Sequence, residues 1–151
     1  MRQFQTMLLA AIIGLSGWAA ADAGEKPKMT VFKTPWCGCC EAWTEIMTAE
    51  GYDVTVRDLE DLDPIKKQAG VPDNMQGCHT AVLDNYVLEG HVPVAAIDKL
   101  LSERPAVRGI AVPGMPQGAP GMGDDPDANY TVYSIGHDAS ETGAVFFEAG
   151  K

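Results

Sequence analysis

The sequence predicts an α/β fold in which helices flank a central β-sheet and an extra β-hairpin follows at the C-terminus. Two observations lead to this prediction. Along residues 26–105, apolar side chains recur first at strand spacing and then at helical spacing, several times in turn. Later in the chain, the runs NYTVYSIG and GAVFFEAG are rich in strand-forming residues and predict a hairpin over residues 129–149.

Residues 1–23 have the pattern of a secretory signal peptide. Arg2 supplies a positive start, an apolar run extends over residues 7–21, and the alanines that end this run fit a signal-peptidase site. The run is shorter than the ~20 residues that a membrane-spanning helix needs. We therefore expect cleavage and export, no membrane span in the mature protein, and one domain over residues 24–151.

The first strand is predicted over residues 26–34, where apolar and polar side chains alternate. A helix is predicted over residues 40–50, because Trp43 and Met47 recur at helical spacing. We expect both of these side chains, together with Met29 of the strand, to lie in the core.

The next elements follow the same alternation. Residues 52–59 are β-branched and alternating, which predicts a second strand, and residues 61–70 predict a short helix that starts near a proline and ends at a glycine. Residues 79–93 predict a hairpin with its turn at Asp84-Asn85, and residues 94–105 predict a third helix.

A Gly/Pro-rich segment separates this part from the C-terminal hairpin. From Gly109 to Pro126, nine of eighteen residues are Gly or Pro. We expect an irregular loop over residues 109–126, because neither residue type supports regular structure.

The formal net charge of −10 excludes nucleic-acid binding by phosphate neutralisation. The chain contains four cysteines, and in an exported protein these would by default form two structural disulfides. Any other interpretation of the cysteines has to account for their spacing better than this default does.

Three of the cysteines lie together in TPWCGCCEAW, where a strand is predicted to end and a helix to begin. Backbone N–H groups and the helix dipole at such a junction favour a thiolate, which is both a nucleophile and a metal ligand. Cys37 and Cys40 have a workable disulfide spacing, whereas adjacent Cys39 and Cys40 do not. The third thiol is then free, paired with Cys78, or bound to a metal.

The segment TPWCGCC resembles the PWCGPC active site of thioredoxins, with Cys39 at the proline position and Trp36 at the tryptophan that lines the site. The segment GCHTAVL, residues 77–83, matches the thioredoxin segment that carries a cis proline, and here His79 replaces that proline. The resemblance implies a thioredoxin-like domain with a central mixed β-sheet. It also implies that Cys78 points toward the other three cysteines.

The departures from the thioredoxin pattern favour a metal site over a dithiol. In thioredoxin-like proteins the cis proline helps to position a substrate chain and shields the dithiol from metals, and it is absent here. Two further thiols are present beside the C-x-x-C pair. Clustered thiolates select Cu(I), Zn(II) or iron–sulfur clusters.

Three blocks in order, TPWCGCCEAW, GCHTAVLDNYVLEGHVP and RGIAVPGMPQGAPGM, are similar to the exported CopG-type copper-resistance proteins over residues 29–122. The resemblance implies a periplasmic protein that binds copper as Cu(I), more than one ion per chain, in a thiolate-bridged cluster. It implies a role in copper resistance, which could include Cu(I)/Cu(II) interconversion, and contact with other periplasmic copper-handling proteins. The ligands that it carries over are Cys37, Cys39, Cys40 and Cys78.

Other soft or imidazole donors lie near these blocks. His79 either caps a copper or hydrogen-bonds a thiolate, or it only fills the place of the missing proline. Met115 and Met122 offer thioethers that suit Cu(I), or they anchor the Gly/Pro-rich loop. His91 is expected to hydrogen-bond that loop, and His137 to lie on the surface.

Two other functions stay open. A thiol–disulfide oxidoreductase would use Cys37 as the attacking thiolate and Cys40 as the resolving cysteine. A structural zinc site or a disulfide scaffold is disfavoured, because adjacent cysteines suit a tetrahedral site poorly and the second C-x-x-C knuckle is missing.

Overall fold

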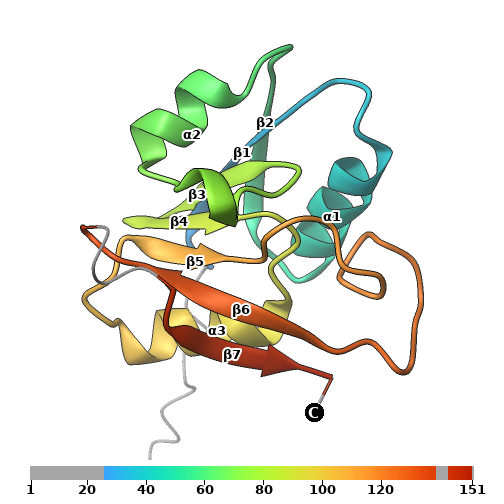
Figure 1. The fold of residues 1–151 in the computed structure, drawn as a ribbon. Helices are drawn as coiled ribbons and strands as arrows, with labels where there is room; N and C mark the ends of the chain where they lie inside the picture. Colours follow the sequence, from blue (N-terminus) through green and yellow to red (C-terminus); the bar gives the residue numbers. More distant parts are fainter. Residues whose placement is uncertain (1–25, 139–142, 151) are drawn as a thin grey trace, which may run out of the picture.

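The structure is a computed structural model that describes residues 26–138 and 143–150. Its centre is a seven-stranded mixed sheet with the strand order β2-β1-β3-β4-β5-β6-β7 (Figure 1). The strands are β1 Lys28–Lys33, β2 Asp53–Asp58, β3 Thr80–Leu83, β4 Tyr86–Glu89, β5 Gly109–Ala111, β6 Tyr130–Ile135 and β7 Val145–Ala149. The sheet is mixed because β1 pairs with β2 and β4 pairs with β5 in parallel, while all other neighbours are antiparallel.

Helices cover both faces of the sheet. Helices α1 (Gly38–Ala49) and α3 (Val94–Glu103) pack on one face, where Trp43 and Ile97 meet Met29 in the main core cluster. The short helix α2 (Asp63–Ala69) and the 3₁₀ turn Asp73–Met75 lie on the other face, over a smaller apolar cluster that includes Val87 and Ile135. The predicted α/β class is therefore confirmed.

The ends of the predicted elements lie within one or two residues of the observed ones, except that the hairpin predicted over residues 79–93 ends at Glu89. The hairpin β3–β4 turns at Asp84, whose φ of 56° is in the left-handed region that a tight two-residue turn requires. Met29, Trp43 and Met47 are fully buried, as expected from their spacing. The C-terminal hairpin is present as the antiparallel pair β6–β7, which extends the sheet beyond β5 (Figure 1).

The prediction of an irregular loop over the whole of residues 109–126 is wrong at its start. Gly109, Ile110 and Ala111 form β5 inside the sheet, and all three are buried. A Cβ on Gly109 would lie 2.0 Å from the Val87 carbonyl oxygen, so a glycine is what allows β5 to approach β4. The Gly and Pro content of the whole segment did not indicate this strand, because most of these residues come after Val112.

The predicted signal peptide, residues 1–23, lies outside the described residues. Across residues 26–138 and 143–150, none of the helices combines the length and hydrophobicity that crossing a bilayer requires.

Candidate metal centre

The sheet brings the four cysteines together from two distant parts of the chain. Cys37 is the N-cap residue of α1, which follows β1 after a short turn, and Cys39 and Cys40 form part of the first helical turn. Strand β3 runs antiparallel to β1 with Thr80 opposite Phe32, so the residues before β3 lie beside the residues after β1. Cys78 occupies that position.

The four sulfur atoms converge as the resemblance to thioredoxin implies. The Sγ atoms of Cys37, Cys39, Cys40 and Cys78 all lie within 4.8 Å of one another. Cys37 and Cys40 form a disulfide with a Cα–Cα distance of 5.3 Å, and Cys39 and Cys78 are free thiols. Cys39 Sγ lies 3.5 Å from Cys37 Sγ and 3.9 Å from Cys78 Sγ, so Cys39 links the disulfide to the distant thiol.

The cluster is partly open to solvent. Cys40 is buried, whereas the other three cysteines are half-buried. Trp36, which was expected to line the site, keeps 69% of its surface exposed. Cys40 is therefore the most deeply buried member of the cluster.

Burial disfavours the thiolate form of Cys78. Desolvation, together with the neighbouring Cys39, raises the pKa of the Cys78 thiol to about 11, although the charge of Lys66 opposes this shift. A metal that binds Cys78 at neutral pH must therefore displace a proton from it.

A buried ion pair that sequence reasoning missed holds the segment that carries Cys78. Lys66 on α2 pairs with Glu89 on β4, and both are almost completely inaccessible to solvent. The Lys66 ammonium donates to the Gly77 carbonyl oxygen at 3.1 Å and to Thr80 Oγ1 at 3.3 Å. Glu89 accepts hydrogen bonds from the Gly77 N–H at 2.8 Å and from the Thr80 hydroxyl at 2.6 Å. The pair thus binds the backbone of Gly77 and the side chain of Thr80, which lie on either side of Cys78.

A second ion-pair group fixes the other half of the site. Lys33, at the end of β1, is buried and lies 3.0 Å from Glu41 of α1 and 3.0 Å from Asp58 of β2. It therefore ties the start of the cysteine-bearing helix to two strands of the sheet.

Two histidines lie behind the cysteines. His79 and His91 are fully buried, and their rings meet edge to face with centroids 5.0 Å apart. The His79 ring also packs against Trp43 at 4.5 Å, and burial lowers the pKa of His79 to about 3, which keeps it neutral. One ring nitrogen of each histidine and Cys40 Sγ lie within 4.8 Å of one another.

The expectation for His91 is confirmed, because its Nδ1 lies 2.7 Å from the Pro120 carbonyl oxygen of the Gly/Pro-rich loop. His79 does fill a packed position in the core, and one of its ring nitrogens also lies close to Cys40 and His91. His137 is exposed, as expected. Nothing in the sequence indicates that His79 and His91, which are twelve residues apart, face each other. Their contact depends on how the two ends of the β3–β4 hairpin come together in the fold.

The two methionine candidates lie on a loop that contacts the cysteine segments. Gly114 forms a bridge with Gly77, which places exposed Met115 one residue beyond this contact. Gly121 packs so closely on α1 that a Cβ there would lie 2.6 Å from the Cys39 carbonyl oxygen, and half-buried Met122 follows it. This segment passes beside α1 in Figure 1.

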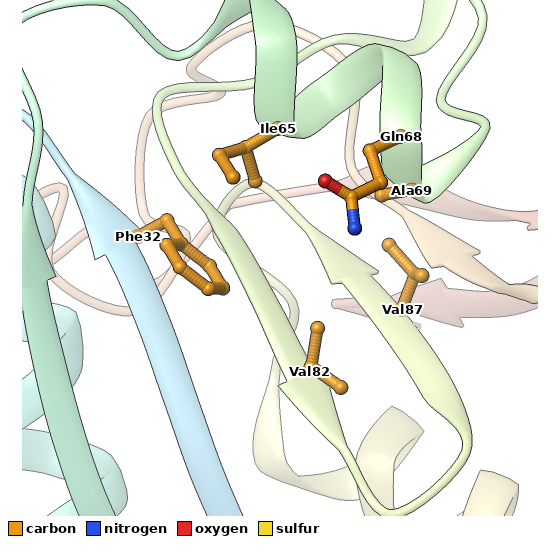
Figure 2. A pocket seen from close by; sticks show the side chains of 6 residues that line it. All are labelled: Phe32, Ile65, Gln68, Ala69, Val82 and Val87. Carbon is orange, nitrogen blue, oxygen red and sulfur yellow. The ribbon is translucent and has the colours of Figure 1, made fainter.

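An apolar cavity of about 230 Å³ lies elsewhere, between α2 and the sheet (Figure 2). None of the candidate ligands lines it, so it is separate from the cysteine cluster. Its lining residues are Phe32, Ile65, Gln68, Ala69, Val82 and Val87.

Comparisons with known proteins agree with this architecture. The solved structure described as "Copper resistance protein copG- Form 2" matches with a TM-score of 0.75 and 39% sequence identity, covering 82% of this chain and 98% of its own. The structure described as "Copper resistance protein copG- Form 1" matches with a TM-score of 0.75 and 38% identity, covering 84% of this chain and 100% of its own.

The family model described as "Protein of unknown function, DUF411" matches residues 75–122, which include Cys78, both buried histidines and the Gly/Pro-rich loop. A search of curated proteins finds no match. From its identity to the two solved structures over most of its length, the chain belongs to the CopG family of copper-resistance proteins.

Proposed function

We propose that this protein is an exported copper-binding protein that holds Cu(I) in a cluster of cysteine thiolates and thereby contributes to copper resistance. The observation that carries the proposal is the convergence of four sulfur atoms within 4.8 Å of one another. The proposed ligands are Cys37, Cys39, Cys40 and Cys78, with His79 and Met115 as additional candidates.

The sulfur spacing fits metal bridging. With metal–sulfur bonds of ~2.3 Å, two sulfurs on one ion lie at most about 4.6 Å apart. The separations of Cys39 Sγ from Cys37 Sγ, 3.5 Å, and from Cys78 Sγ, 3.9 Å, both fall inside this limit. Cys39 is therefore the natural bridging ligand between ions bound on its two sides.

Charge favours several Cu(I) ions rather than one. Four thiolates in a half-buried site carry four negative charges, and each Cu(I) cancels one of them. Because desolvated charge is costly, a site with more than one Cu(I) is more stable than a site with a single ion and three uncompensated charges. Soft thiolate ligands also select Cu(I) over harder cations.

Copper binding of this kind depends on the redox state of the cysteines. While the Cys37–Cys40 disulfide is closed, only Cys39 and Cys78 can become thiolates. Reduction of the disulfide by two electrons supplies the other two ligands. The full set of thiolate ligands therefore exists only in the reduced protein.

The same disulfide favours a second candidate function, in which the protein exchanges electrons with copper or with another thiol. Formation of one disulfide from two thiolates releases two electrons, which reduce two Cu(II) to two Cu(I). In a thiol–disulfide exchange, Cys37 would be the attacking thiolate and Cys40 the resolving one, since Cys37 caps α1 and is half-buried whereas Cys40 is buried.

The apolar N-terminal run supports a periplasmic location, and other periplasmic copper-handling proteins are the proposed partners. Met115, with 59% of its surface exposed next to the cysteine segment, would suit the transfer of Cu(I) through a thioether.

Anaerobic titration of the reduced mature protein with Cu(I), with free thiols counted at each point, tests the proposal. We expect more than one Cu(I) per chain, protection of all four thiols, and fewer Cu(I) ions per chain in Cys39→Ser and in Cys78→Ser. His137→Asn, at an exposed position, is the matched control and should bind as the parent does. Weak binding by the parent, or serine variants that bind equally well, would contradict the cluster. Insulin reduction by the metal-free protein would instead favour thiol–disulfide exchange.

A further inference from the structure

We propose that Cys40, His79 and His91 form a second, inner Cu(I) site that opens when the Cys37–Cys40 disulfide is reduced. The inner site shares Cys40 with the proposed four-cysteine cluster and rests on that proposal only for the choice of copper as the metal. It differs from the four-cysteine cluster in its two histidine ligands, of which His79 is only an additional candidate there, and in its complete burial.

Three separate parts of the chain supply the donors. Cys40 comes from the first turn of α1, His79 directly precedes β3, and His91 follows β4. All three side chains are fully buried, and their donor atoms lie within 4.8 Å of one another. Ligands bound to one ion by bonds of ~2.0–2.3 Å lie at most about 4.0–4.6 Å apart, so shifts of less than about 1 Å bring the donors within this limit.

The histidine nitrogens point to a ligand because the protein leaves them without partners. Neither Nδ1 nor Nε2 of His79 has a hydrogen-bond partner, and the same is true of His91 Nε2. Buried polar atoms in folded proteins are nearly always satisfied. Because one nitrogen of each ring lies within 4.8 Å of the other ring's nitrogen and of Cys40 Sγ, these unpartnered groups mark a position where a ligand would bind.

The hydrogen bond of His91 fixes which of its nitrogens can bind a metal. A neutral imidazole donates one N–H, and a carbonyl oxygen only accepts, so the 2.7 Å contact with Pro120 O places the proton on Nδ1. His91 Nε2 then carries the free lone pair. Metal-binding histidines usually donate their other N–H to a carbonyl or a carboxylate in this way, which orients the ring.

Charge selects the metal. One thiolate and two neutral imidazoles carry a single negative charge, which one Cu(I) cancels. A divalent ion in the same three-ligand site would leave a net positive charge in an environment that contains the Trp43 ring and excludes solvent. The soft sulfur and imidazole donors likewise suit Cu(I).

The disulfide controls access to the inner site. In the disulfide, the Cys40 sulfur is bonded to Cys37 and cannot act as a thiolate. A dithiol reductant would convert the protein disulfide into two thiols and itself become a disulfide. Cys40 then loses its proton as Cu(I) binds. The inner site would therefore be absent in the oxidised protein and present in the reduced one.

The inner site can be tested apart from the outer cluster. In Cys39→Ser/Cys78→Ser, the outer bridging sulfurs are removed while all three inner donors remain. We expect this variant to bind one Cu(I) per chain when reduced and none when its disulfide is closed. X-ray absorption at the copper edge should show both nitrogen and sulfur neighbours.

Adding His91→Asn to this variant removes Nε2 but keeps an amide that can donate to Pro120 O. We expect Cu(I) affinity, measured by competition with a chromophoric chelator, to fall at least tenfold, whereas His137→Asn should not change it. Equal Cu(I) binding by the oxidised and reduced forms would overturn the proposal. So would an unchanged Cu(I) affinity after His91→Asn, together with an X-ray absorption spectrum that shows only sulfur neighbours around copper.

A measurement on the full chain covers the case in which these variants fold poorly. In reduced, ¹⁵N-histidine-labelled protein, Cu(I) should shift the resonance of His91 Nε2 and of one nitrogen of His79, and leave His137 unchanged. Unshifted resonances of both buried histidines would overturn the inner site even if all four thiols are protected. Conversely, shifted resonances of the buried histidines, together with unprotected thiols at Cys39 and Cys78, would contradict the four-cysteine cluster but not the inner site.

Discussion

At the scale of single residues, Cys39 distinguishes this site from a thioredoxin-like dithiol. It occupies the position between the C-x-x-C cysteines where the resembling thioredoxin motif has proline. Its sulfur lies within 3.5 Å of one member of the disulfide and 3.9 Å of Cys78. These two contacts place Cys39 between the disulfide and Cys78, so this side chain connects the two halves of the site.

Cys39→Pro tests this role. Residue 39 lies in the first turn of α1, where proline is tolerated because its missing N–H would have no partner within the helix. We expect the variant to keep its fold, with a melting temperature within a few degrees of the parent's, and to lose most of its Cu(I) capacity. Cys39→Ser controls for the loss of the sulfur alone.

The reduced Cys39→Pro variant should also reduce insulin faster than the parent, because the remaining dithiol is free of the bridging thiol. Full copper capacity in this variant would contradict the role given to Cys39.

At the scale of elements, the position of Cys78 depends on helix α2 and strand β4. Buried ion pairs contribute little net stability, but removing one partner is strongly destabilising because the other charge stays buried. The Lys66–Glu89 pair bonds to residues on both sides of Cys78, so its loss affects the site as well as the fold.

Lys66→Met removes the ammonium while retaining an apolar stem. We expect a loss of about 3–5 kcal/mol in the free energy of unfolding, measured by denaturant titration, because the Glu89 carboxylate stays buried without its partner. The double variant Lys66→Met/Glu89→Gln should lose less, since it buries no charge. Lys67→Met, the exposed neighbour on the same helix, should change stability by less than about 0.5 kcal/mol. Equal losses in the single and double variants would show that the charge imbalance is unimportant.

At the scale of the whole molecule, the order of strands and helices followed from hydrophobic periodicity, and the position of Cys78 followed from the resemblance to thioredoxin. Strand β5 was missed because composition does not distinguish a glycine in a strand from a glycine in a loop. Gly109 is needed in β5 because the backbone of β4 approaches it closely. The Lys66–Glu89 pair and the facing rings of His79 and His91 were also missed. Each joins residues that are distant in sequence, and their contacts arise only from the register and packing of the folded sheet.

The fold also explains why one region combines so many donors. The end of β1, the start of β3, the end of β4 and the loop after β5 meet at one edge of the sheet. The Gly/Pro-rich loop contacts two of these segments, through the Gly77–Gly114 bridge and through Gly121 against α1. The proposed inner copper site thus lies deeper in the same region than the proposed four-cysteine cluster, and the two sites share Cys40.

The central claim is that the four cysteines hold Cu(I) as one thiolate-bridged cluster. X-ray absorption at the copper edge of the reduced, unmodified protein, loaded with Cu(I) to saturation, tests it most directly. The account predicts a shell dominated by sulfur together with a copper–copper vector, because bridging thiolates hold neighbouring ions close together. A spectrum with no copper–copper vector, or a shell of oxygen and nitrogen without sulfur, would contradict it.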